Sequence, residues 1–123
     1  MLFKDDFYSI ESSRDEENAK VFSIKLNEDH DIYKGHFPGN PVTPGVVQME
    51  IIRELTSESL KNSVLLDSMG NCKFLAILNP NTDRNVDVFL KISELEEKKF
   101  RVTAQIQNES TVFIKMNAIY VFA

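Results

Sequence analysis

The chain has 123 residues, of which 42% are hydrophobic and 27% are charged, and its formal net charge is −5. This is the length of one globular domain, so we treat residues 1–123 as a single unit. An acidic balance argues against nucleic acid as a partner, because affinity for nucleic acid comes mostly from cations on phosphates. The longest apolar run, Ala118–Ala123, is too short to span a membrane.

Two strands are predicted near the start of the chain. Phe7–Glu11 and Ala19–Leu26 carry the β-branched and aromatic residues that are typical of strands, and the polar segment 12–18 joins them.

One helix is predicted, from Gly45 to about Lys61. Thr43 is a candidate N-cap, and Pro44 suits a first turn, where its missing N–H costs nothing. At helical spacing, one side carries Met49, Ile51, Ile52, Leu55 and Leu60, and the other carries Glu50, Arg53, Glu54, Ser57 and Lys61.

Four more strands are predicted in the rest of the chain. Lys99–Gln107 and Asn85–Ser93 alternate apolar and polar residues, which is typical of half-buried strands, and 94–99 reads as their hairpin connection. Asn71–Leu78 and Thr111–Phe122 complete the set. Two strands, one helix and four strands predict an α+β fold, an antiparallel sheet of about six strands packed on a single helix.

The segment 34–50 is the part of the chain most suggestive of chemistry. It holds three of the four glycines and three of the four prolines, a density that indicates a tightly fixed loop. His36 lies on this loop, the N–H of Gly45 opens the helix, and Glu50 follows inside the helix. A histidine, free N–H groups at a helix start and a carboxylate are suited to acid–base chemistry beside a carbonyl.

These residues resemble a known family, the 3-hydroxyacyl-[acyl-carrier-protein] dehydratases of the hot-dog fold. The resemblance rests on Gly35-His36-Phe37-Pro38-Gly39, Pro41, Pro44-Gly45 and Glu50, which match the family signature in register over about 17 residues. It implies a hot-dog fold, in which the sheet wraps around the central helix. It also implies reversible dehydration of a 3-hydroxyacyl thioester to the trans-2-enoyl thioester, without a cofactor.

The resemblance assigns roles to individual residues. His36 and Glu50 correspond to the catalytic pair, and Gly45 to the backbone N–H that binds the thioester. The candidates for the wall of the acyl tunnel are Phe37, Val46, Val47 and Met49. Glu at the helix position favours dehydration without isomerisation of the double bond. Members often carry Gln four residues later, where this chain has Glu54.

Glu50 carries an electrostatic expectation as well. Val46 and Val47 precede it in the first turn, which would place its carboxyl beside apolar groups. Such surroundings would raise its pKa and favour a role as general acid.

The family implies an acyl carrier protein as partner, although coenzyme A stays open as the carrier, and it implies a homodimer or a multiple of dimers. One helix cannot cover both faces of six strands, which also favours association. Because carrier proteins of this kind are acidic, a basic patch is expected, with Lys34, Arg53, Lys73 and Arg84 as candidates.

Two other functions remain open: a hot-dog acyl thioesterase, and a non-catalytic acyl-binding partner of a biosynthetic complex. His30 is interpreted as a solvated or structural residue and Cys72 as a buried small one, since no motif surrounds either. The two histidines and scattered carboxylates lack the spacing of metal ligands. A single cysteine and an acidic N-terminus without an apolar segment favour the cytoplasm.

Overall fold

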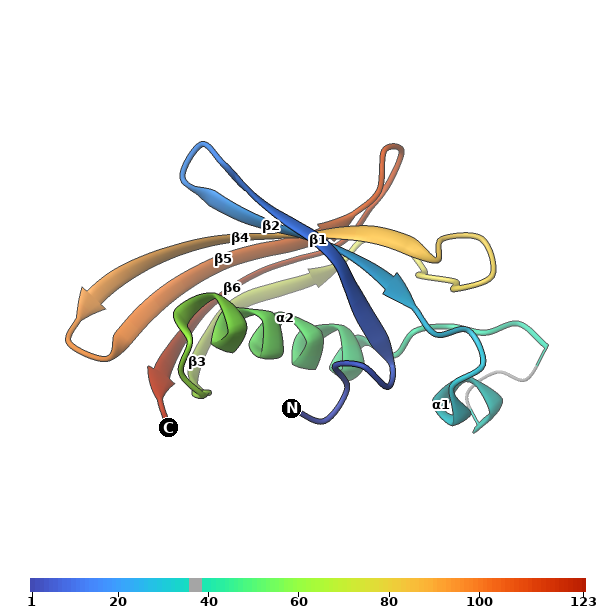
Figure 1. The fold of residues 1–123 in the computed structure, drawn as a ribbon, viewed down its shortest axis with the longest axis horizontal. Helices are drawn as coiled ribbons and strands as arrows, with labels where there is room; N and C mark the ends of the chain where they lie inside the picture. The colour runs from blue at the N-terminus through green and yellow to red at the C-terminus, as the bar shows by residue number, and fades with distance from the viewer. Residues whose placement is uncertain (36–38) are drawn as a thin grey trace.

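The computed structural model describes residues 1–35 and 39–123, which form one six-stranded antiparallel sheet and two helices. The strands are β1 (Tyr8–Glu16), β2 (Ala19–Leu26), β3 (Val64–Phe74), β4 (Asn85–Glu96), β5 (Lys99–Gln107) and β6 (Val112–Phe122), and the helices are α1 (Asp31–Gly35) and α2 (Gly45–Leu60). The spatial order of the strands is β1-β2-β4-β5-β6-β3. Figure 1 shows the sheet curving over α2, as in a hot-dog fold.

The predicted order of elements is confirmed, and β2 and β5 have the predicted bounds. The short helix α1 was not predicted, because five residues carry too little periodicity to reveal it. Neither helix in the described ranges is long and apolar enough to cross a membrane.

Three strand predictions were wrong in extent. β4 continues to Glu96, so its turn to β5 is shorter than the predicted connection 94–99. β1 continues through the polar residues 12–16. The prediction missed this part because both faces of the strand are largely solvated there, so no apolar alternation marks it. β3 begins at Val64 and ends at Phe74, whereas Asn71–Leu78 was predicted. Bulges opposite β6 interrupt its alternation, and this hides the first half of the strand from a pattern of period two.

The helix α2 packs its apolar stripe against the concave face of the sheet. Ile51, Ile52 and Leu55 are fully buried there. Burial of each such side chain contributes about 1.5–3 kcal/mol to folding. The helix ends where Lys61 adopts a left-handed conformation and its N–H bonds to the carbonyl of Ser57.

The predicted cap at Thr43 is wrong. The N-cap position is Pro44, and no side chain caps the helix. The Thr43 hydroxyl lies 2.8 Å from the hydroxyl of Tyr33, and its backbone N–H bonds to the carbonyl of Leu78. The hydroxyl of Thr43, which was predicted to cap the helix, is therefore bound by the buried Tyr33.

The helical spacing placed Glu54 on the polar side of the helix, but the structure does not expose it to solvent. Its side chain is fully buried, and its carboxylate accepts hydrogen bonds from the N–H groups of Phe3 and Lys4, both at 2.9 Å, and from the Tyr8 hydroxyl at 3.0 Å. The pKa of Tyr8 is raised by burial first and by Glu54 second. Glu54 therefore ties the start of the chain to the middle of α2.

Replacing Glu54 tests this tie. Glu54→Ala leaves N–H donors without an acceptor and is expected to lower the free energy of unfolding by about 2–4 kcal/mol. Glu54→Gln keeps one acceptor oxygen and should cost less. Denaturant unfolding measures both, with Glu58→Ala as control, since Glu58 makes only a surface ion pair with Lys4 worth at most about 1 kcal/mol. Equal losses in Glu54→Ala and Glu58→Ala would contradict the assignment.

Candidate active site

The start of α2 presents backbone donors next to an aromatic ring. Gly45 is the first residue of the helix, so its N–H has no acceptor within the helix. The carbonyl of Pro44 accepts hydrogen bonds from the N–H groups of Val47 and Gln48. The ring of Phe74, at the end of β3, packs directly against Gly45. A side chain at position 45 would have its Cβ 2.5 Å from the ring Cζ, so the half-exposed ring would have to move aside.

Glu50 lies one turn further along the helix and is paired with Arg53. The Nη2 atom of Arg53 donates to Oε2 of Glu50 at 2.6 Å, and its Nε donates to Oε1 at 2.8 Å. The remaining Nη1 donates to the backbone carbonyl of Val64 at 2.9 Å, at the first residue of β3. Arg53 thus joins the carboxylate to the edge strand of the sheet through three of its nitrogens.

The electrostatic expectation for Glu50 is wrong in this structure. The hydrogen bonds from Arg53 hold the pKa of Glu50 below its ordinary value, and they outweigh the opposing effect of burial. Val46 does not shield the carboxylate, because its side chain is 74% exposed.

A cavity of about 190 Å³ opens beside Glu50, between α2, β3 and β6. Its lining residues are Val46, Met49, Glu50, Arg53, Leu66, Met69 and Tyr120. The wall is apolar except for the Glu50–Arg53 pair and the phenol of Tyr120, whose burial raises its pKa to about 12. An acyl chain would find apolar contacts here with one charged pair at its side.

The structure brings together part of the predicted site. Gly45, Val46, Met49 and Glu50 lie along the first half of α2, and the last three line the same cavity. Val47 is buried in the core of the fold and does not line the cavity. His36 and Phe37 lie outside the described residues.

Sequence reasoning missed Phe74 and the role of Arg53. A spacing of three residues between Glu50 and Arg53 on a helix was the available signal for their pairing. No local signal marks Phe74, because its contact with Gly45 joins two distant parts of the chain. In the described ranges, no three His, Cys, Asp or Glu side chains are grouped as metal ligands.

Comparison with known families identifies the class of protein. A family model described as "ApeI-like: ApeI dehydratase" matches residues 12–115. A 3-hydroxyacyl-[acyl-carrier-protein] dehydratase FabZ from Rickettsia canadensis is 30% identical over 113 residues, which span 83% of this chain and 78% of the relative. The FabZ of Wolbachia pipientis is 27% identical over 106 residues, 80% of this chain and 73% of the relative.

Solved structures share the fold. The dehydratase heterocomplex ApeI:P from Xenorhabdus doucetiae matches with a TM-score of 0.66 at 18% identity, covering 91% of this chain and 96% of that chain. A variant of a thioesterase enzyme from Staphylococcus aureus matches with a TM-score of 0.61 at 16% identity, covering 93% and 91%.

The fold and the family matches are those of a hot-dog dehydratase, a hydro-lyase. Within that class, the chain belongs to the ApeI-like dehydratase family.

The contact between Gly45 and Phe74 gives a test of the local packing. Gly45→Ala is expected to cost at most about 1 kcal/mol, because the new methyl group displaces a ring that is half-exposed and can move. In a Phe74→Ala background the same change should be neutral or stabilising, since alanine is the better helix former. Thermal unfolding of the four proteins of this cycle measures the coupling. Equal effects of Gly45→Ala in both backgrounds would contradict the contact.

Proposed function

We propose that this dehydratase removes water from a 3-hydroxyacyl thioester carried by an acyl carrier protein, giving the trans-2-enoyl thioester. The observation that carries the proposal is the carboxylate of Glu50 beside an apolar cavity, one turn from the N–H of Gly45 at the start of the helix. The names of the FabZ relatives support the choice of substrate.

In the proposed mechanism, neutral His36 removes the proton on the carbon next to the thioester carbonyl. Negative charge develops on the carbonyl oxygen, and the Gly45 N–H at the positive end of α2 stabilises it. The bond from the β-carbon to the hydroxyl breaks, and protonated Glu50 gives its proton to the departing oxygen, which leaves as water. The pair therefore starts with one proton on Glu50 and ends with one proton on His36.

A thioesterase reaction is the second candidate, because structural relatives include a thioesterase enzyme. That reaction would use a carboxylate, or the water it activates, to attack the carbonyl of a saturated acyl thioester. The sequence Gly35–Gly39 and the family match favour dehydration instead.

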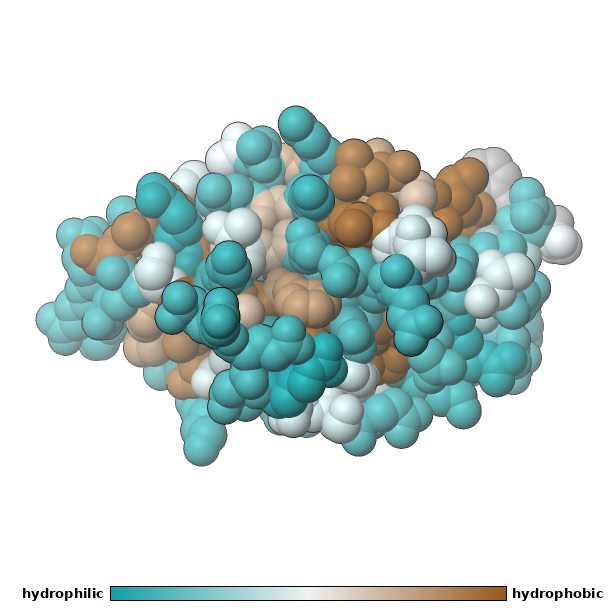
Figure 2. All heavy atoms as spheres, turned by 90° about the horizontal axis from the view of Figure 1, so that it is seen from above, coloured by the Kyte–Doolittle hydropathy of each residue, from teal (hydrophilic) through white to brown (hydrophobic). Residues whose placement is uncertain are grey.

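A second copy of the chain is proposed to complete the site. β3 is an edge strand, and the apolar residues exposed on it, on the segment that follows it and at the start of α2 are Val46, Leu65, Leu66, Phe74, Leu75 and Ile77. Figure 2 shows apolar residues gathered in patches on a face that is otherwise largely hydrophilic. Exposed apolar area of this kind is typical of an interface between subunits.

The acyl carrier protein is proposed to dock through Lys73. The reaction is proposed to take place in the cytoplasm. Of the four basic candidates, Lys34 is paired with Asp31, Arg53 with Glu50 and Arg84 with Glu28. Lys73 makes no ion pair within the part of the chain that the structure describes, and it precedes Phe74 at the end of β3. Its charge is therefore available to an acidic partner near the helix start.

Replacement of His36 tests the reaction. His36→Ala should fold normally and lose dehydration by at least about 100-fold, the usual scale for a positioned acid or base. Turnover of a 3-hydroxyacyl thioester and of a saturated acyl thioester, followed in parallel, separates a dehydratase from a thioesterase. Retained dehydration in His36→Ala would remove the proposed role of this histidine, and hydrolysis of the saturated substrate alone would favour the thioesterase.

A mixing experiment tests whether each site combines His36 of one chain with Glu50 of the other. Inactive His36→Ala and Glu50→Ala chains are unfolded together, refolded, and shown to be dimers by sedimentation. Random pairing makes half of the dimers mixed, and each mixed dimer holds one intact site, so about a quarter of wild-type activity should return. A mixture that exchanges subunits but stays inactive would show that each site lies within one chain.

A further inference from the structure

The contact between Arg53 and Glu50 has a geometry that a general acid does not require. A carboxyl group that only donates a proton needs an apolar wall, yet Glu50 accepts from both Nε and Nη2 of Arg53. Arg53 and Glu50 are each about one quarter exposed, so water screens the pair less than it screens a surface ion pair. Two parallel hydrogen bonds fix the plane of the carboxylate as well as its position.

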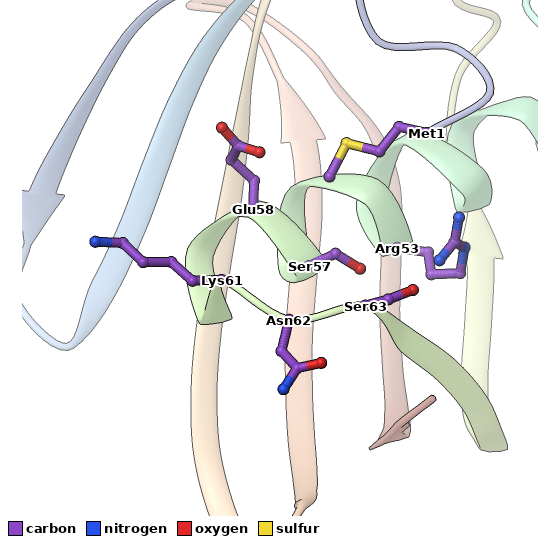
Figure 3. A pocket seen from close by; sticks show the side chains of 7 residues that line it. All are labelled: Met1, Arg53, Ser57, Glu58, Lys61, Asn62 and Ser63. Atoms are coloured by element: carbon purple, nitrogen blue, oxygen red, sulfur yellow. The ribbon is translucent and has the colours of Figure 1, made fainter.

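Arg53 is itself held in place. Its Nη1 donates to the carbonyl of Val64, so the guanidinium cannot follow the carboxylate away from β3. Figure 3 shows Arg53 at one end of a second, larger pocket on the far half of α2, with Lys61 at the other end. This pocket of about 480 Å³ and the small cavity share Arg53, so this side chain lines both.

The other charged groups around Glu50 cannot replace Arg53. The neighbouring carboxylate of Glu54 is occupied by Phe3, Lys4 and Tyr8. Glu54 and the charge of the N-terminal amine also lower the pKa of Glu50, but both effects are smaller than that of Arg53. The phenols of Tyr8 and Tyr120 do not stabilise its charge; instead, the charge of Glu50 raises the pKa of both. Arg53 is thus the cation that sets the orientation and the charge of this carboxylate.

We propose that Arg53 is a positioning residue of the dehydratase site, which orients the Glu50 carboxylate toward the cavity. This inference rests on the proposed function for its catalytic consequence. Ionised Glu50 with protonated His36 is the state in which dehydration ends and hydration begins. Because Arg53 donates two hydrogen bonds to the carboxylate form of Glu50, it also favours the state that Glu50 reaches when dehydration ends.

Two variants separate orientation from charge. Arg53→Met removes both, so kcat should fall by about 10- to 100-fold with little change in KM, because a misplaced acid affects the chemical step. The limb of the pH profile that reports Glu50 should also move to higher pH, since the bonds that lower its pKa are gone. Arg53→Lys keeps the charge without the two-pronged geometry, so kcat should stay low while the limb moves to higher pH by less than in Arg53→Met.

The control is Arg14→Met, which removes an arginine of the same kind from an exposed ion pair with Glu16 on β1. It should leave kcat and the pH profile unchanged. Wild-type thermal stability in each variant shows that a loss of kcat is not a loss of fold. Unchanged kcat and pH profile in Arg53→Met would overturn the proposal, as would full recovery of kcat in Arg53→Lys, which would show that orientation is irrelevant.

A titration that needs no turnover separates this proposal from the proposed function. In protein carrying ¹³C-labelled glutamate, the Glu50 carboxyl resonance is assigned by its absence in Glu50→Gln and followed with pH. Its midpoint should lie at higher pH in Arg53→Met than in the wild type, and an unmoved midpoint would overturn the hold of Arg53 on Glu50. If the wild type does not dehydrate 3-hydroxyacyl thioesters, the proposed function fails while this titration still decides the role of Arg53.

Discussion

The burial of one helix inside a curved sheet is the constraint on which the rest of this structure depends. Ile51, Ile52 and Leu55 are fully buried against the sheet, and this fixes the rotation of α2 about its axis. Once that rotation is fixed, every other position on the helix has a defined neighbour. The site is therefore a consequence of the same packing that stabilises the domain.

The two carboxylates of α2 show how strongly that rotation decides a residue's use. Glu50 and Glu54 are one turn apart on a helix, yet their surroundings differ completely. Glu54 is fully buried and is taken up by backbone N–H groups of the first residues, so it stabilises the fold. Glu50 opens onto a cavity and is held by Arg53, so it is available for chemistry.

The site lies where α2 meets β3, at one edge of the sheet. Phe74 packs on Gly45 at one end of this seam, and Val64 binds Arg53 at the other. The same edge strand exposes Leu65 and Leu66 to solvent. Packing of a second copy against this edge would thus act directly on the strand that positions the helix start and the Glu50–Arg53 pair.

The sequence by itself determined the class of fold, the helix that carries the site and the segment with its chemical motif. Alternation of period two in β5 and the cluster of glycine and proline before Gly45 are local patterns, and local sterics and hydrogen bonding produce them. Only the tertiary structure decided the partner of Thr43, the burial of Glu54, the bulged course of β3 and the lowered pKa of Glu50. Each of these depends on contacts between residues far apart in the chain, or on which of several nearby donors a side chain binds, and a one-dimensional pattern does not contain that choice.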